Sequence, residues 1–188
     1  GPGMIFRATR PITLNDIVKS PIRRTLMGLE YLLFRRGLMT TNGSFGAACL
    51  KTDPSLSATD IRLKINLWGK SRVRKTKGAK RDLGLLPFSA FTILMSMQHP
   101  DSRGTVRAKS ADTGQQPQIR FNFFSSESDQ RTCVKSIRMI RDIMSQAPIR
   151  PYVQEEISPG PDCTSDEGLV EFCRKIGRST FHASGTCK

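Results

Sequence analysis

The segment from Asp60 to Trp68 alternates apolar and polar side chains, and this period of two constrains the fold more than any other feature. One face carries Ile61, Leu63, Ile65 and Leu67, and the other carries Arg62, Lys64, Asn66 and Trp68. Successive side chains of a strand point to opposite faces of its sheet. A strand with one solvated face is typical of an antiparallel sheet. The pattern therefore predicts such a strand here.

Four other segments are predicted as strands. Met4–Thr9 is short and partly β-branched, and Ala90–Met97 is nearly all apolar, as expected of a central strand. Gly104–Ser110 and Ile119–Phe124 add two more, joined by a polar hairpin connection. Thr40–Ala48 is rich in small residues and is expected to be a flexible connection.

Helical patterns lie at both ends of the chain. After a brief helical turn at Thr13–Asp16, Ser20 and Pro21 form a helix start, and the helix ends near Arg36. Its apolar stripe is Ile22, Leu26, Leu29 and Leu33. Two later helices are expected, one over Asp129–Ser145 and one that begins with a Thr164-x-x-Glu167 capping box and ends at Gly177.

This order of elements predicts the fold class. Strands in the middle with helices at both ends favour an α+β layer, a mainly antiparallel sheet of about five to six strands with helices packed on one face. A doubly wound parallel sheet is excluded. At 188 residues one domain is sufficient, and we assign it residues 4–188 because Gly1-Pro2-Gly3 has the form of a remnant of tag removal.

Composition narrows the cellular setting. The five cysteines are odd in number and scattered, without a C-x-x-C pair, which argues for reduced thiols and against a disulfide framework or a zinc site. No apolar run reaches the length of about 20 residues of a membrane helix, and no signal peptide pattern is present. We expect a cytoplasmic protein without a membrane partner.

The net charge of +14 raises a nucleic-acid hypothesis. Half of the excess lies in one acid-free run: Lys70, Arg72, Arg74, Lys75, Lys77, Lys80 and Arg81. The run contains no aromatic residue to stack on bases and matches no recognition motif, so a solvated loop is favoured. A non-catalytic basic module that binds nucleic acid or another polyanion through Lys70–Arg81 remains the alternative function.

His182 is the candidate catalytic residue because it lies in a loop of small residues beyond the last helix, where an imidazole can take a proton near neutral pH. The alternative is a histidine that hydrogen-bonds its own loop. His99 is expected to be a surface or packing residue, and Cys187 beside Lys188 is a candidate reactive thiol. Trp68 and Phe91 lie on strands where a substrate pocket and core packing explain them equally well.

The terminal residues His182-Ala183-Ser184-Gly185-Thr186-Cys187-Lys188 resemble the His-Pro-x-Gly-Thr signature of the glucose–methanol–choline (GMC) oxidoreductases, with alanine in place of proline. Five further blocks resemble that family in order: Thr13-Leu14-Asn15-Asp16, Glu30-Tyr31-Leu32-Leu33, Asp60-Ile61, Pro100-Asp101-Ser102-Arg103-Gly104, and Asn122 with Ser125 and Asp129. The likeness covers about Phe6 to Lys188 and is greatest to bacterial choline-dehydrogenase-like and alcohol-dehydrogenase-like members.

The resemblance implies a substrate-binding domain, an antiparallel sheet with helices on one face, and a structural position for Cys187. It also implies that His182 acts as general base or orients the alcohol, while a hydride passes to the flavin of FAD and a primary alcohol becomes an aldehyde. No Gly-x-Gly-x-x-Gly follows a strand, and the family's Met-Gly after Lys188 is missing. We therefore expect a fragment truncated at both ends, inactive alone, with no cofactor-binding or metal residues. Its partners would be the missing FAD-binding domain, a small alcohol substrate in the full-length enzyme, or a second copy of the fragment.

Overall fold

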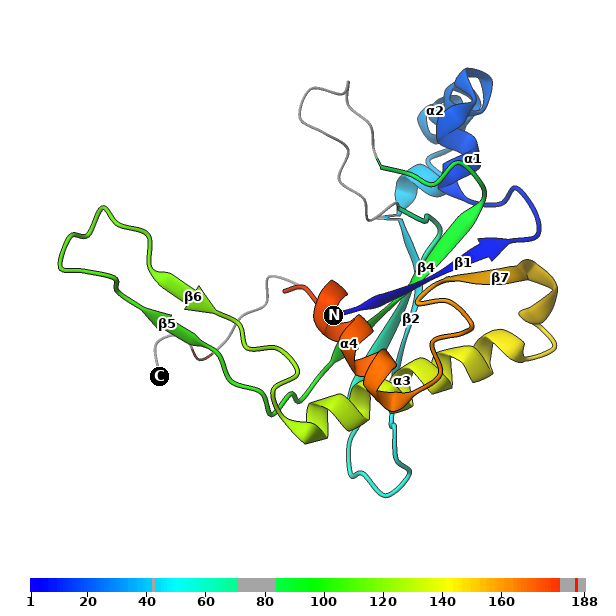
Figure 1. Cartoon of the computed structure of the whole chain (residues 1–188). Coiled ribbons are helices and arrows are strands. Elements are labelled where there is room, and N and C mark those ends of the chain that lie inside the picture. The colour runs from blue at the N-terminus through cyan, green and yellow to red at the C-terminus, as the bar shows by residue number, and fades with distance from the viewer. Residues whose placement is uncertain (42, 71–83, 180–184, 186–188) are drawn as a thin grey trace.

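A computed structural model describes residues 1–41, 43–70, 84–179 and 185 of the chain. In these ranges five strands form one antiparallel sheet, in the order β2-β3-β4-β1-β7 (Figure 1). They are β1 (Gly3–Ala8), β2 (Ser44–Leu50), β3 (Ile61–Asn66), β4 (Ala90–Met97) and β7 (Val153–Ser158). The predicted α+β class is confirmed, and β4 is the central strand that its apolar sequence predicts.

The hydrophobic core lies between one face of the sheet and two helices, α3 (Glu127–Ser145) and α4 (Asp166–Ile176). Alternate strand positions supply the sheet side: Met4, Phe6, Ala8, Ile61, Leu63, Phe91, Ile93 and Met95. The helix side comes from Cys133, Val134, Ile137, Ile140, Met144, Leu169, Val170 and Cys173. Burying a large aliphatic side chain contributes roughly 1.5–3 kcal/mol. The helix expected over Asp129–Ser145 is confirmed as α3, which begins two residues earlier and buries the stripe Cys133, Ile137, Ile140 and Met144.

Three expectations about strands need correction. Thr40–Ala48 is not a flexible connection throughout, because β2 begins at Ser44 and pairs with β3. Strand β7 was not expected, since its sequence Val-Gln-Glu-Glu-Ile-Ser lacks a clear alternation. The segments near 104–110 and 119–124 form the short strands β5 (Thr105–Arg107) and β6 (Gln118–Arg120), which pair with each other and extend away from the main sheet (Figure 1).

The N-terminal residues take part in the fold. Gly3 lies in β1 opposite Leu94, and the N–H of Met95 donates to the carbonyl of Pro2 at 2.9 Å. A Cβ on Gly3 would lie 2.7 Å from the Leu94 side chain, so the position is closely packed. That Gly1-Pro2-Gly3 derives from tag removal stays a prediction.

Helix α4 begins one residue later than the proposed capping box. Its N-cap is Ser165, whose hydroxyl accepts the N–H of Gly168 at 3.1 Å, so Thr164 is not the cap. Serine satisfies the free N–H groups of a first turn as threonine does, which is why sequence spacing alone could not separate the two. The helix ends at Gly177 as expected.

At the N-terminal end, α1 (Leu14–Lys19) leads directly into α2 (Pro21–Phe34), and a short 3-10 turn follows at Leu38–Thr40. A second 3-10 turn, Arg150–Tyr152, lies between α3 and β7. The Ser20 hydroxyl accepts the N–H of Arg23 at 3.3 Å, which confirms the expected helix start. Helix α2 has no buried residue and stands clear of the core at the top of Figure 1. None of the helices described in the structure combines the length and apolarity that crossing a membrane requires.

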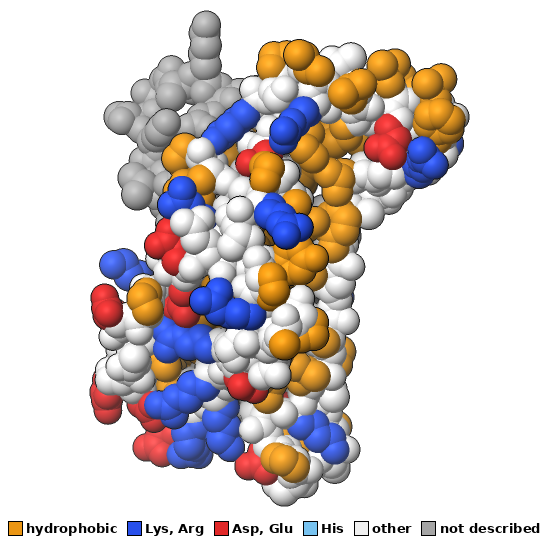
Figure 2. Space-filling view, turned by 90° about the vertical axis from the view of Figure 1, so that its right-hand side faces the viewer, with side chains coloured by type: hydrophobic (Ala, Val, Ile, Leu, Met, Phe, Trp, Pro, Cys, Tyr) orange, Lys and Arg blue, Asp and Glu red, His pale blue; other side chains and the backbone are white. Residues whose placement is uncertain are grey.

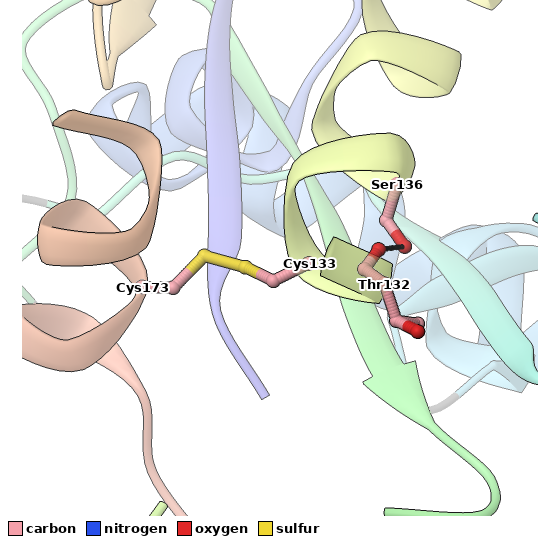
Figure 3. The surroundings of a disulfide bond; sticks show 4 residues. All are labelled: Thr132, Cys133, Ser136 and Cys173. Carbon is pink, nitrogen blue, oxygen red and sulfur yellow. Dashed lines mark hydrogen bonds between the residues drawn. A yellow bond between two sulfur atoms is a disulfide. The ribbon is translucent and has the colours of Figure 1, made fainter. Parts of the chain in front are cut away.

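A disulfide joins Cys133 of α3 to Cys173 of α4 (Figure 3). The expectation that all thiols are reduced is therefore wrong for this pair. The two cysteines lie 40 residues apart, and each sits on the buried stripe of its helix, so they meet because α3 and α4 pack side by side. Sequence spacing carries no signal of that contact. Cys49 and Cys163 are free.

We predict that the unfolded chain presents two fewer reactive thiols before reduction than after it, because Cys133 and Cys173 are bonded to each other. Maleimide labelling followed by intact-mass measurement counts the adducts. The Cys49→Ser variant is the control, since it should lower both counts by one. Equal counts before and after reduction would show that the two thiols are not joined.

Candidate functional site

The predicted catalytic residue His182 lies outside the described residues, together with Cys187 and Lys188. The structure does describe the place from which this segment departs. After α4 ends at Ile176, the carbonyl of Arg178 accepts a hydrogen bond from the N-terminal ammonium of Gly1 at 2.7 Å. Burial lowers the pKa of this ammonium group. The terminal segment therefore leaves α4 beside the beginning of β1.

The end of α4 rests on Phe124, a buried residue at the base of the β5–β6 hairpin. A Cβ on Gly177 would lie 2.8 Å from the Phe124 ring, so glycine permits this close approach. The Phe124 carbonyl accepts hydrogen bonds from the Gln130 side chain at 2.9 Å and from Arg174 at 3.4 Å. These contacts fix the hairpin base, α4 and the start of the terminal segment relative to one another.

Asp129 holds the other side of the hairpin base. Its buried carboxylate accepts the N–H groups of Asp101 at 2.8 Å and Ser102 at 2.9 Å. The Asn122 side chain donates to the Arg103 carbonyl at 3.0 Å, across the two strands of the hairpin. Asp129 lies in the first turn of α3, where a negative charge interacts favourably with the helix dipole. The family-like blocks at 100–104 and 122–129 thus form one structural clasp.

We predict that Asp129→Asn lowers the free energy of unfolding by about 1–3 kcal/mol, because an amide offers one acceptor oxygen and turns an NH₂ group toward a backbone donor. Urea unfolding measures the change. The control is Glu127→Gln in the same turn, an exposed side chain for which a change within about 0.5 kcal/mol is expected. Similar effects of the two substitutions would contradict the clasp.

A second clasp lies at the foot of the basic run. The side chain of Asn15, fully buried in α1, donates to the carbonyls of Gly69 at 2.8 Å and Leu86 at 3.0 Å. Its carbonyl oxygen accepts the N–H of Gly69 at 3.0 Å. Lys70 and Leu85 form an antiparallel bridge next to these contacts. Asn15 therefore holds together the two ends of the connection that carries the basic residues.

The other residues of this block complete the clasp. The Thr13 hydroxyl lies 3.1 Å from the Ser89 hydroxyl and accepts the N–H of Ala90 at 3.2 Å. The Thr13 N–H donates to Asp16 at 3.1 Å, which closes a capping box at the start of α1. Of the run Lys70–Arg81, Lys70 is exposed and residues 71–81 lie outside the described part of the chain. The polyanion alternative therefore stays a prediction.

Replacing Asn15 by alanine is predicted to cost about 3 kcal/mol of unfolding free energy, because the buried N–H of Gly69 and the half-buried carbonyl of Leu86 would lose their side-chain partner. Thermal and urea unfolding provide the measurement. Lys19→Ala, at an exposed position of the same short helix, is the matched control and should change stability by about 0.5 kcal/mol or less. A tolerated Asn15→Ala would mean that α1 is held by other contacts.

The remaining candidates separate into core and surface residues. Phe91 is buried and stacks on Phe6 with ring centroids 5.5 Å apart, so core packing explains it. Trp68 is half-buried over Gly43, where a Cβ would lie 2.0 Å from the indole ring. Gly43 has φ +79°, a conformation that favours glycine. His99 is exposed. The described residues contain no cluster of three or more potential metal ligands.

Sequence reasoning missed one half-buried ion pair. Arg141 of α3 makes two hydrogen bonds of 2.9 Å to Glu156 of β7, and it also donates to the Gly160 carbonyl at 3.0 Å. The hydrogen bond to Glu156 raises the pKa of Arg141. Because β7 was not expected, nothing in the sequence pointed to this partner. The pair fixes the edge of the sheet to α3, and its role is structural.

Known proteins resemble this chain over most of its length. A family model described as GMC oxidoreductase matches residues 100–188. An oxygen-dependent choline dehydrogenase of Photobacterium profundum is 33% identical over 185 residues, which cover 97% of this chain and 31% of that protein. One from Escherichia coli is 47% identical over 93 residues, 50% of this chain and 16% of that protein. Nearly the whole of this chain therefore aligns with the Photobacterium profundum protein, but it spans only about a third of that protein's length.

Solved structures share the fold at low identity. A formate oxidase of Aspergillus oryzae superposes with a TM-score of 0.78 and 18% identity, covering 99% of this chain and 36% of the other. An FAD-dependent oxidoreductase of Chaetomium thermophilum superposes with a TM-score of 0.68 and 14% identity. The superposition covers 93% of this chain and 35% of the other. The family match includes the family-like blocks at 100–104 and 122–129, and residues 100–188 of this chain belong to the GMC oxidoreductase family.

Proposed function

We propose that the chain is the substrate-binding part of an FAD-dependent oxidoreductase that oxidises a primary alcohol to an aldehyde, as a choline-dehydrogenase-like enzyme would. One observation carries the proposal: 33% identity to an oxygen-dependent choline dehydrogenase extends over 97% of the chain. An alignment of that extent includes the residues of both clasps, so it does not depend on the His182 motif alone.

The described residues do not fit FAD by themselves. A dinucleotide pyrophosphate is bound where a strand passes through a glycine-rich turn into the N-terminus of a helix. The connection from β1 to α1 contains no glycine, and α1 has six residues. Within the described ranges no other strand leads through such a turn into a helix. We therefore assign FAD binding in the full-length enzyme to further polypeptide.

For His182 we propose the role of general base or of orienting the alcohol. A neutral imidazole is a suitable acceptor for the hydroxyl proton near neutral pH, and removing that proton makes the carbon-bound hydrogen easier to transfer. Support comes from the match of residues 100–188 to the family and from the Phe124–Gly177 contact, which gives the segment containing His182 a defined start.

The chain alone is predicted to bind no FAD and to oxidise no choline. After incubation with FAD and gel filtration, its absorbance spectrum should lack the visible flavin bands. A full-length choline dehydrogenase carried through the same steps is the control and should retain them. A flavin band that co-elutes with this chain would contradict the assignment of FAD binding to other polypeptide.

A chimera tests His182. The matching region of the Photobacterium profundum choline dehydrogenase is replaced by this chain, with either His182 or His182→Ala. We expect both chimeras to contain flavin and the His182→Ala form to turn over alcohol roughly 10²–10⁴-fold more slowly, the usual contribution of a general base. Flavin content separates misfolding from lost chemistry. Equal turnover of two flavin-loaded chimeras would disprove the proposed role.

A further inference from the structure

Helix α2 is turned with its most apolar side outward. The side toward the body carries Met27 and Tyr31, which are half-buried, whereas Ile22, Leu26, Leu29 and Leu33 are between 45% and 72% exposed. Leu32 and Phe34 are exposed beside them. Figure 2 shows hydrophobic side chains on the arm at the top, the level at which Figure 1 places α2. An exposed helix normally shows water its polar face, so this orientation suits a partner surface.

The spacing of the outward residues specifies what kind of surface fits. Ile22, Leu26, Leu29 and Leu33 are separated by four, three and four residues, which is the spacing of the a and d positions of a coiled coil. Such a seam accepts a second helix with the same repeat. Among the described helices, α3 has the same spacing in Cys133, Ile137, Ile140 and Met144, but those residues are buried in the core. Helix α2 is thus the described helix that presents this repeat to solvent, and a second α2 offers it a matching seam.

We propose that α2 is a self-association surface on which a second copy of this chain docks its own α2, antiparallel to the first. In this arrangement Leu26 of one copy packs against Leu29 of the other, and Ile22 against Leu33. The proposal goes beyond the alcohol chemistry and does not depend on it.

Charge favours the antiparallel direction. Arg23 and Glu30 lie on the same flank of the seam, seven residues apart. An antiparallel pair brings Arg23 of each copy close to Glu30 of the other, giving two equivalent interchain ion pairs, and it also opposes the helix dipoles. A parallel pair would place the Arg23 side chains on the same level. Glu30 now lies 3.5 Å from Arg36 in an exposed contact, which is weak enough to be exchanged.

The test is sedimentation velocity on the purified chain over a wide range of concentrations at moderate salt. We expect a reversible monomer–dimer equilibrium. Leu26→Lys and Leu29→Lys should each raise the dimer dissociation constant at least about 100-fold, because each places a charge in the seam. The matched control is Arg24→Lys, on the side of α2 away from the seam, which should leave the constant unchanged. Circular dichroism checks that every variant is folded.

A charge exchange tests the orientation. Arg23→Glu alone and Glu30→Arg alone should each weaken the dimer, because each brings like charges together, and the double variant R23E/E30R should recover most of the loss. A chain that stays monomeric, or a dimer indifferent to Leu26→Lys, overturns the proposal. So does a monomer that binds anionic phospholipid vesicles through Leu26, because α2 would then be a lipid-binding helix. Failure of these tests would leave the chimera result unaffected.

Discussion

Packing of α3 and α4 against one face of the sheet is the constraint on which the remaining structure depends. The core cluster takes alternate residues of β1, β3 and β4 and the inward stripes of both helices, and the disulfide between Cys133 and Cys173 ties the two helices together. Once this layer is formed, the end of α4 lies against Phe124 and the start of β1. The origin of the terminal segment thus follows from core packing.

Two polar clasps fix loops that the apolar core does not hold. Asn15 and Asp129 are buried side chains whose partners are backbone groups of distant loops. Each fixes the base of a connection: Asn15 joins Gly69 and Leu86, on either side of the basic run, and Asp129 holds the base of the β5–β6 hairpin. A buried polar group with its hydrogen bonds made costs little, and one without them is expensive, so these residues specify a single loop arrangement. This gives a physical reason why the family-like blocks cluster at loop bases.

The parts of the fold that sequence predicted are those determined by local pattern. Strand β4 matches the apolar run Ala90–Met97, and α3 buries the stripe that its period of 3.6 indicates. Strand β7 depends on pairing with β1 and on the Arg141–Glu156 contact, neither of which is visible in Val-Gln-Glu-Glu-Ile-Ser. The Cys133–Cys173 bond depends on helix packing in the same way. Of the candidate site, the structure describes the residues that lead toward His182, up to Ser179. The proposed chemistry of His182 rests on the resemblance to the family.

The outward seam of α2 links assembly to local stability. A helix of 14 residues is marginal in isolation, and most helical stability in proteins comes from packing an apolar face. In this chain α2 has the Ser20 cap, Pro21 at its start and a left-handed Arg35 at its end, but it leaves five large aliphatic residues in water. A surface that covers them would stabilise α2 and α1 together, because the two helices are consecutive. Since Asn15 connects α1 to Gly69 and Leu86, ordering of α2 would extend to the base of the basic run.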